Sequence, residues 1–362
     1  MKPSLRATTT VLALLLLASC VPPQPFSSRA SGELFFSADN GARVDVMPAD
    51  CLVSGDACPS AIMLSLYPEE WNVASLTWTA DGATAAVTSA DQPNDHLALL
   101  TPPSRQLHRF ASLATISQVV WSPDGKQLAV SGVAERGQKN TATAEAQIRD
   151  STIYLYSAAG KELGNLTEAL SGIKSDVAWL SPDQLLFQNF YSEQDCDLYV
   201  LTISNGALAP WTESPLCHAS PAIAQDAAQV AFVRDGNLYL ANADGSSAAM
   251  ILDLPADIDE PAWSPDGQWI AFDEVEPAAV AVVHPDGTGY QPVADNMHNA
   301  GFAPLTGEAL LVTTASHPQG SGSFTASWYV TTIPDGQPGA VTIPGIPPDQ
   351  MPLNIAWRPP KQ

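Results

Sequence analysis

Oxygen-bearing side chains stand three residues before a recurrent apolar or aromatic position, and their types suit cation binding. Four of them are Asp176, Glu260, Asn299 and Asn354. Carboxylate and amide oxygens are the ligands that a hard cation such as Ca²⁺ prefers. If the strands that carry them converge, they form a polar ring able to hold calcium in a tunnel. The alternative, which we favour, is a hydrated tunnel mouth that needs no metal.

Cysteines are the second group with reactive side chains. After Cys20 the chain has four: Cys51, Cys58, Cys196 and Cys217. An even number in an exported protein indicates disulfides, and four cysteines allow three pairings. We favour Cys51–Cys58 and Cys196–Cys217, because each pair lies within one local unit. A zinc site is the alternative, but no Cys-x-x-Cys or histidine spacing supports it.

The familiar catalytic motifs are absent from the sequence. It has no Gly-x-Ser-x-Gly for a serine nucleophile, no His-Glu-x-x-His for zinc and no glycine-rich phosphate loop. We therefore expect no intrinsic catalysis and no resident cofactor. A calcium-dependent, lactonase-like hydrolase with its metal in the tunnel is the alternative.

A repeated sequence motif predicts the strands and turns that would position these residues. It reads Trp-Ser-Pro-Asp-Gly at 121–125 and 263–267, and partial copies begin at Trp78 and Trp179. Proline presets φ for a tight turn, aspartate caps it and glycine accepts positive φ. Each copy is followed by a short apolar run, so the phrase predicts a β-hairpin.

This repeat resembles that of the TolB-type β-propeller family, from about residue 33 to 359. Propeller blades are four-stranded units with a period of about 40–50 residues. The resemblance implies the fold and leaves the function open. The anchor positions, defined as the last residues of the innermost strands, are Trp78, Trp121, Trp179, Ala222, Trp263, Phe302 and Trp357.

The seven anchors predict an all-β protein, a propeller of seven four-stranded blades in a single domain over 32–359. No first strand precedes Leu34–Ser37, and none of the usual followers comes after the anchor at Asn354–Trp357. We expect these two segments to pair and close the ring. Six blades are the alternative, if the unit at Ala222 or the one at Phe302 is not a true blade.

The N-terminus has the pattern of a secretory signal. Lys2 and Arg6 precede a short apolar stretch, and Leu-Ala-Ser-Cys at 17–20 resembles the lipobox of bacterial lipoproteins. This resemblance implies a signal peptide at 1–19, lipid on Cys20 and a proline-rich tether at 20–31. An ordinary secreted protein with a chance cysteine is the alternative. We expect an extracytoplasmic protein held to the cell envelope by its lipid.

The charge balance excludes some partners. The formal net charge is −23, and cleavage after residue 19 would remove two further positive charges. Such a surface disfavours nucleic acid and electrostatic binding to anionic lipid. We expect a monomer that acts as a platform for an envelope or extracellular protein or ligand. Candidate contact segments are the connections Arg136–Asp150 and Ser316–Phe324, and candidate exposed aromatics are Trp71, Trp211 and Trp328.

Replacing the lipobox cysteine tests the predicted anchor. In cells, Cys20→Ala should release the protein to the soluble fraction or leave an uncleaved precursor, because the acylated residue is lost. Fractionation with N-terminal sequencing measures both outcomes. Membrane retention with a normally cleaved N-terminus would contradict the anchor.

Overall fold

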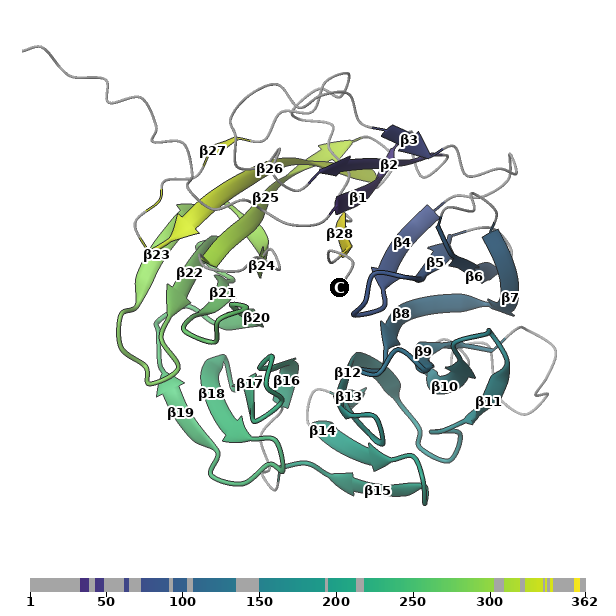
Figure 1. Cartoon of the computed structure of the whole chain (residues 1–362). Helices are drawn as coiled ribbons and strands as arrows, with labels where there is room; N and C mark the ends of the chain where they lie inside the picture. The colour runs from purple at the N-terminus through teal and green to yellow at the C-terminus, as the bar shows by residue number, and fades with distance from the viewer. Residues whose placement is uncertain are drawn as a thin grey trace, which may run out of the picture.

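The computed structural model describes residues 33–38, 43–48, 62–64, 73–90, 94–102, 107–134, 150–192, 195–212, 218–302, 309–319, 323–334, 336, 339–340 and 355–358. These residues form seven four-stranded antiparallel sheets. The sheets stand around a centre like the blades of a propeller, and the chain passes through them in order (Figure 1). The predicted all-β propeller is therefore confirmed. Within the described ranges, no helix is long and apolar enough to cross a membrane.

We number the sheets as blades 1 to 7 and give their strands from the centre outward. Blade 1 contains β28 (Ile355–Arg358), β1 (Glu33–Ala38), β2 (Arg43–Pro48) and β3 (Ile62–Leu64). Blade 2 contains β4 (Val73–Trp78), β5 (Ala85–Ser89), β6 (Asp95–Leu100) and β7 (Leu107–Leu113). Blade 3 contains β8 (Thr115–Trp121), β9 (Gln127–Val133), β10 (Thr152–Ser157) and β11 (Glu162–Asn165).

The remaining blades repeat this order. Blade 4 contains β12 (Ile173–Ser181), β13 (Gln184–Ser192), β14 (Asp195–Thr202) and β15 (Ala207–Pro210). Blade 5 contains β16 (His218–Ile223), β17 (Gln229–Arg234), β18 (Asn237–Asn242) and β19 (Ala249–Leu252). Blade 6 contains β20 (Ile258–Trp263), β21 (Ile270–Glu274), β22 (Ala279–Val283) and β23 (Gln291–Asp295). Blade 7 contains β24 (His298–Phe302), β25 (Ala309–Gln319), β26 (Ser323–Ile333) and β27 (Gly339–Ala340).

The first and last strands of the chain share one sheet, as expected. β28 pairs with β1 in an antiparallel ladder that runs from Glu33 opposite Arg358 to Phe36 opposite Ile355. Figure 1 shows β28 between β1 and β4 at the centre of the ring. Blade 1 is thus built from both ends of the described chain.

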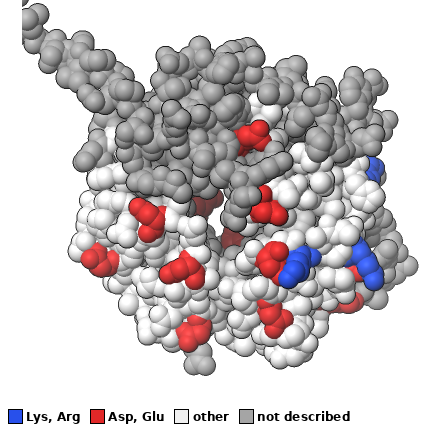
Figure 2. Space-filling view, in the orientation of Figure 1, with Lys and Arg blue, Asp and Glu red and all other residues white. Residues whose placement is uncertain are grey.

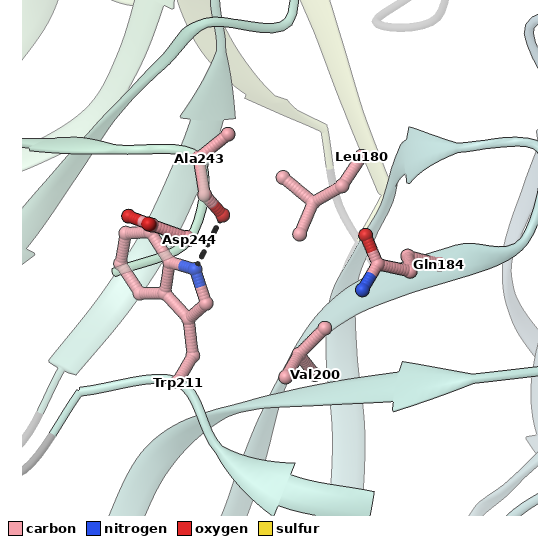
Figure 3. A pocket seen from close by; sticks show the side chains of 6 residues that line it. All are labelled: Leu180, Gln184, Val200, Trp211, Ala243 and Asp244. Carbon is pink, nitrogen blue, oxygen red and sulfur yellow. Dashed lines mark hydrogen bonds between the residues drawn. The ribbon is translucent and has the colours of Figure 1, made fainter. Parts of the chain in front are cut away.

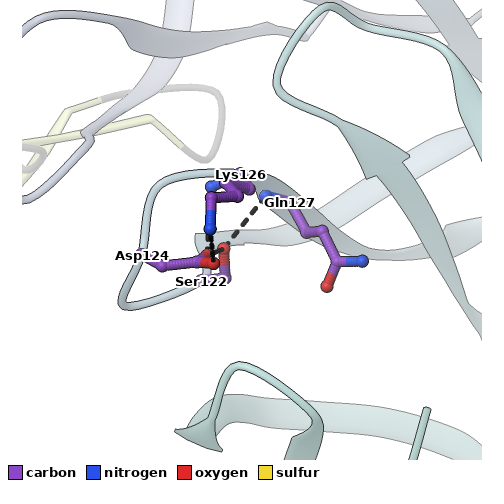
Figure 4. A network of polar contacts seen from close by, with 4 residues as sticks. All are labelled: Ser122, Asp124, Lys126 and Gln127. Atoms are coloured by element: carbon purple, nitrogen blue, oxygen red, sulfur yellow. Dashed lines mark hydrogen bonds and ion pairs between the residues drawn. The ribbon is translucent and has the colours of Figure 1, made fainter. Parts of the chain in front are cut away.

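The repeated turn phrase is held by its own polar side chains. Ser122 Oγ donates a hydrogen bond to Asp124 (2.8 Å) and accepts one from the backbone amide of Gln127 (2.9 Å) (Figure 4). Asp124 also accepts from the Lys126 backbone amide at 3.2 Å, and the Lys126 ammonium lies 3.1 Å from its other oxygen. The hydroxyl of Ser122, and then Lys126, lower the pKa of Asp124. Thr79–Asp81 and Ser264–Asp266 repeat the side-chain bond, each at 2.6 Å.

The anchor tryptophans join each blade to the one before it. Trp78, Trp121 and Trp179 are buried. Three indole N–H groups donate to a carbonyl near the end of the innermost strand of the preceding blade: Trp121 to Thr77 (3.0 Å), Trp179 to Val120 (3.2 Å) and Trp263 to Ala222 (3.0 Å). Apolar clusters fill the space between successive sheets; one packs Trp179 and Phe187 of blade 4 against Ile153 of blade 3. The core is therefore divided among the interfaces between blades.

One predicted connection is shorter than expected. We expected a connection at Ser316–Phe324, but β25 extends to Gln319 and β26 begins at Ser323. The two strands pair without interruption from Ala309 opposite Ile333 to Gln319 opposite Ser323. Cross-strand pairing carries the ladder into a stretch rich in serine and glycine and containing a proline, whose composition suggested a loop. Residues 135–149 of the other expected contact segment lie outside the described ranges.

Removing the closing strand tests how far the ring depends on it. Truncation after Met351 removes β28 and leaves the inner edge of β1 unpaired, so we expect a loss of at least about 2 kcal/mol in unfolding free energy. Truncation after Pro359 keeps β28 and is the control. Urea unfolding measures both variants, and equal midpoints would contradict a closing role.

Candidate binding site at the centre of the ring

Three neighbouring inner strands carry the same backbone irregularity. Asp176 in β12, Ser220 in β16 and Glu260 in β20 have φ values of 50°, 52° and 48°. Each of these residues lies where the pairing register shifts between the first and second strands of its blade. Positive φ is uncommon for residues other than glycine and costs about 1–3 kcal/mol. Bulges of this kind redirect side chains, and here they do so at three equivalent positions.

The strand pairing in blades 5 and 6 shows that one predicted anchor position is wrong by one residue. Ile223 pairs with Val230 as Trp263 pairs with Ile270, so Ile223 and not Ala222 is the anchor of blade 5. Ala222 instead supplies the carbonyl that accepts the Trp263 indole N–H. Ser220, and not Ala219, therefore stands at the position of Asp176 and Glu260. The unit at Ile223 and the unit at Phe302, on which the six-blade alternative depended, each form a four-stranded sheet.

Polar contacts link these positions from blade to blade. Ser220 Oγ donates to Asp259 Oδ1 at 2.6 Å, and the same oxygen accepts the Glu260 backbone amide at 2.8 Å. Asp176 accepts a hydrogen bond from the Ser220 backbone amide, and the Ser175 hydroxyl donates to it at 3.2 Å. Blades 4, 5 and 6 are thus connected along their inner strands.

A glutamine extends this chain of contacts to blade 3. Gln118 lies three residues before the anchor Trp121. Its Oε1 accepts the Val177 backbone amide at 2.7 Å, and its Nε2 donates to the Val177 carbonyl at 3.2 Å. The bulge next to Asp176 is therefore supported from the neighbouring blade.

Four carboxylates gather at this place, and we call Asp176, Asp259, Glu260 and Asp273 the acidic cluster. Burial first, and then the charge of Asp259, raise the pKa of Asp176 against the opposing hydrogen bonds. Partial desolvation of its carboxyl group raises the pKa of Glu260, and Asp273, Asp259 and Asp176 raise it further. Asp273 lies in β21, is 6% exposed and faces His298 Nδ1 at 3.9 Å. Burial is the largest cause of both shifts, and repulsion between like charges adds to it.

The wider surface has the same sign. Figure 2 shows acidic side chains spread over the visible face and inside its central hollow, with few lysines and arginines. Acidic residues exceed basic ones by 38 to 15 in the whole chain. The potential at the centre therefore attracts cations and repels anions.

The predicted polar ring is only partly seen. Asp176 and Glu260 come together through the acidic cluster. Asn299 lies within β24 at its register shift, its side chain outside the description, and Asn354 lies outside the described residues. Ser220 and Asp273 were missed, because neither a register shift nor a second-strand contact is visible in the sequence.

The described residues contain no group of three or more His, Cys, Asp and Glu arranged to hold a metal ion. Calcium in the tunnel accordingly stays a prediction. Of the cysteines, Cys196 is described and buried in β14, while Cys51, Cys58 and Cys217 lie outside the described ranges, as does Cys20. The pairing of the cysteines also stays a prediction. Trp211 and Trp328 are 5% and 1% exposed, so the expectation that they are exposed is wrong.

A buried lysine is the other strongly perturbed group. Burial lowers the pKa of Lys174 to about 8, against the nearby charge of Asp150. Its ammonium donates to the carbonyls of Leu170 and Gly172. Ser131 Oγ and Ser151 Oγ donate to the Lys174 carbonyl oxygen, at 2.5 and 3.4 Å. These recorded contacts run to the backbone of Lys174, so they do not make the hydroxyl-to-amine bond that would activate a serine nucleophile.

No family model matches the chain. Among solved structures, it is similar to the propeller domain of the Trilobed protease from Pyrococcus furiosus, described as having an open velcro topology. The identity is 12%, the match covers 83% of this chain and 86% of that one, and the TM-score is 0.55. It is also similar to Pyrococcus horikoshii acylaminoacyl peptidase, with 12% identity, 83% and 47% coverage and a TM-score of 0.56.

TolB from Acinetobacter baumannii is a further structural neighbour, with 15% identity, 74% and 65% coverage and a TM-score of 0.51. Likeness at these identities shows a TolB-like propeller fold alone. In sequence, 79 residues are 28% identical to the uncharacterized peptidase YuxL of Bacillus subtilis, covering 20% of this chain and 12% of that protein. The matches thus span less than two thirds of YuxL, acylaminoacyl peptidase and TolB.

These comparisons correct the expectation of no intrinsic catalysis. YuxL is named a peptidase, and two structural neighbours are a peptidase and the propeller domain of a protease. The matches are to propeller segments of peptidase-related proteins, so they do not support excluding catalysis. The missing sequence motifs misled us because propeller residues are dictated by turns and packing, whatever chemistry accompanies them.

Neutralising Glu260 tests the repulsion within the acidic cluster. A carboxyl group with a raised folded-state pKa destabilises the fold above that pKa and has no such effect below its ordinary value of 4.5. Glu260→Gln should therefore raise the unfolding free energy at pH 7.5, by up to about 1 kcal/mol given solvent screening, and by less at pH 4.

Urea unfolding at both pH values measures this effect, with Glu162→Gln on the exposed outer strand β11 as the matched control. An equal gain in the control variant, or a larger gain at pH 4, would contradict repulsion at Glu260.

Proposed function

We propose that this protein is a propeller platform that captures a cationic segment of a polypeptide at the centre of its ring. The observation that carries the proposal is the acidic cluster, in which burial, and then the charges of carboxylates from blades 4 and 6, raise the pKa of Asp176 and Glu260. A bound cation would relieve the repulsion between these carboxylates, and this relief would contribute to the binding free energy. The TolB-like fold supports a binding role, since a rigid scaffold can present recognition groups at fixed positions.

The backbone is prepared for such a role. Ser220 and Asp259 lock together across two blades, and Gln118 supports the bulge beside Asp176. Groups held in advance lose little conformational entropy on binding. Positive φ at three equivalent positions is retained although it is unfavourable, which is the pattern of a functional constraint.

We also propose that the platform works outside the cytoplasm. The signal-like N-terminus and the lipobox-like Leu-Ala-Ser-Cys support this location. The four further cysteines also support it, because disulfides persist in an oxidising compartment. Lipid on Cys20 would tether the propeller through residues 20–31. The disulfides Cys51–Cys58 and Cys196–Cys217 belong to the same proposal.

A second candidate function follows from the peptidase relatives. The match to YuxL favours a role in peptide hydrolysis, in which the captured polypeptide is a substrate. Both candidates require polypeptide binding. They differ in whether the peptide is cleaved when it is incubated with the protein.

Direct binding of a charged peptide tests the proposal. A fluorescein-labelled octalysine should bind the purified protein and an octaglutamate should not, as measured by fluorescence anisotropy at low ionic strength. The double variant Asp176→Asn/Glu260→Gln should weaken octalysine binding about fivefold, because two carboxylates of the cluster are lost. Mass spectrometry of the same mixtures shows whether the peptide is cleaved.

A charge-matched control separates the site from the overall charge. Glu162→Gln/Asp253→Asn removes two exposed charges on or beside the outer strands β11 and β19, and it should weaken binding far less. Equal weakening by both double variants would show attraction by net charge alone and would refute the central site.

A further inference from the structure

A cavity of about 290 Å³ lies between blades 4 and 5, apart from the acidic cluster. Leu180, Val200, Trp211 and Ala243 give it an apolar interior, and Gln184 and Asp244 stand at its edge (Figure 3). Leu180 is four residues after Asp176 along β12, so the cavity is about 13 Å further along that strand. Gln184 and Asp244 are exposed, so the cavity opens to solvent.

Trp211 is a fixed wall of this cavity. Its indole N–H donates to the Ala243 carbonyl at 2.9 Å, and its backbone amide donates to the Leu198 carbonyl at 2.8 Å. The ring also meets Phe232 edge-on, with centroids 5.4 Å apart. Anchored to two blades, the indole presents a surface that does not have to be ordered when a ligand arrives.

Asp244 is a fixed charge at the same opening. It sits in the tight turn between β18 and β19, where its Oδ1 accepts the Ser246 backbone amide at 2.9 Å. Hydrogen bonds from Ser246 lower the pKa of Asp244, so its carboxylate is ionised at neutral pH. Gly245 has φ of 81°, and a Cβ there would lie 2.1 Å from the Trp211 carbonyl oxygen. The turn that carries Asp244 therefore packs directly against the backbone of Trp211.

From these contacts we propose that the cavity binds a basic side chain of a polypeptide, arginine or lysine. Its methylene stem would lie against Leu180, Val200 and the exposed edge of Trp211, and its cationic head would reach Asp244. Such side chains pair an apolar stem with a charged end, as this cavity does.

Size and charge exclude other occupants. The volume is at the lower limit of ligand pockets, which run from about 300 to 1,000 Å³, so it suits one side chain and not a whole cofactor. Anions are repelled by Asp244 and by the net charge of −23. The proposal does not depend on the acidic cluster, because none of its residues lines this cavity.

Peptides that differ only in charge provide the test. Acetyl-Gly-Arg-Gly-amide should bind the intact protein, seen by saturation-transfer NMR with the strongest transfer to the arginine methylene protons. Its citrulline counterpart has nearly the same shape without the charge and should bind about threefold more weakly, the effect of one solvent-exposed ion pair. In Asp244→Asn the two peptides should bind equally, while the asparagine keeps the Oδ1 that caps the turn.

Asp286→Asn is the matched control. Asp286 caps the corresponding turn of blade 6, accepting the Thr288 backbone amide at 2.9 Å, and does not line the cavity. This variant should keep the preference for arginine. Equal binding of the two peptides to the original protein, a preference that survives Asp244→Asn, or no saturable binding would each overturn the proposal. None of these outcomes bears on octalysine capture by the acidic cluster.

Discussion

An indole N–H bonded to a carbonyl of the preceding inner strand sets the spacing at three interfaces between blades, and the candidate site depends on that spacing. Trp121, Trp179 and Trp263 each make this hydrogen bond, at 3.0 to 3.2 Å. A buried donor that lost its partner would cost about 1–3 kcal/mol, so the distance between inner strands is strongly constrained. Apolar clusters between the sheets then fill a space whose width these bonds help to set.

That spacing is what brings the candidate site together. Ser220 and Asp259 belong to different blades, yet their side chains are 2.6 Å apart, which requires adjacent inner strands at a fixed offset. Asp176 meets Ser220 in the same way from the other side. The site is therefore a property of the ring, since no single blade contains it.

How much could be predicted from the sequence depended on the range of the interaction involved. Turns such as Ser122–Gln127 are held by contacts between residues that are close in the sequence, so the sequence predicts them. The tryptophan anchors could then be predicted from their position next to these turns. The anchor of blade 5 was misplaced by one residue, because Ile223 lacks the indole that marks the others and the two-residue bulge before it has no local signal. Asp273 was missed for a different reason: it lies on a second strand and reaches the cluster through tertiary packing. The long hairpin of β25 and β26 shows cross-strand pairing overriding a loop-like composition.

Closure of blade 1 has a consequence for the order in which the protein can be completed. β1 is made before blades 2 to 7 and its inner partner β28 after them, so β1 has an open inner edge while those blades are made. Blades 2 to 7 each draw their strands from one continuous stretch and can form as the chain emerges. Unpaired strand edges invite pairing with other chains, which makes the half-finished blade the stage most exposed to aggregation or proteolysis. A chain interrupted just before Ile355 would therefore have six complete blades and, in blade 1, one strand with an unpaired inner edge.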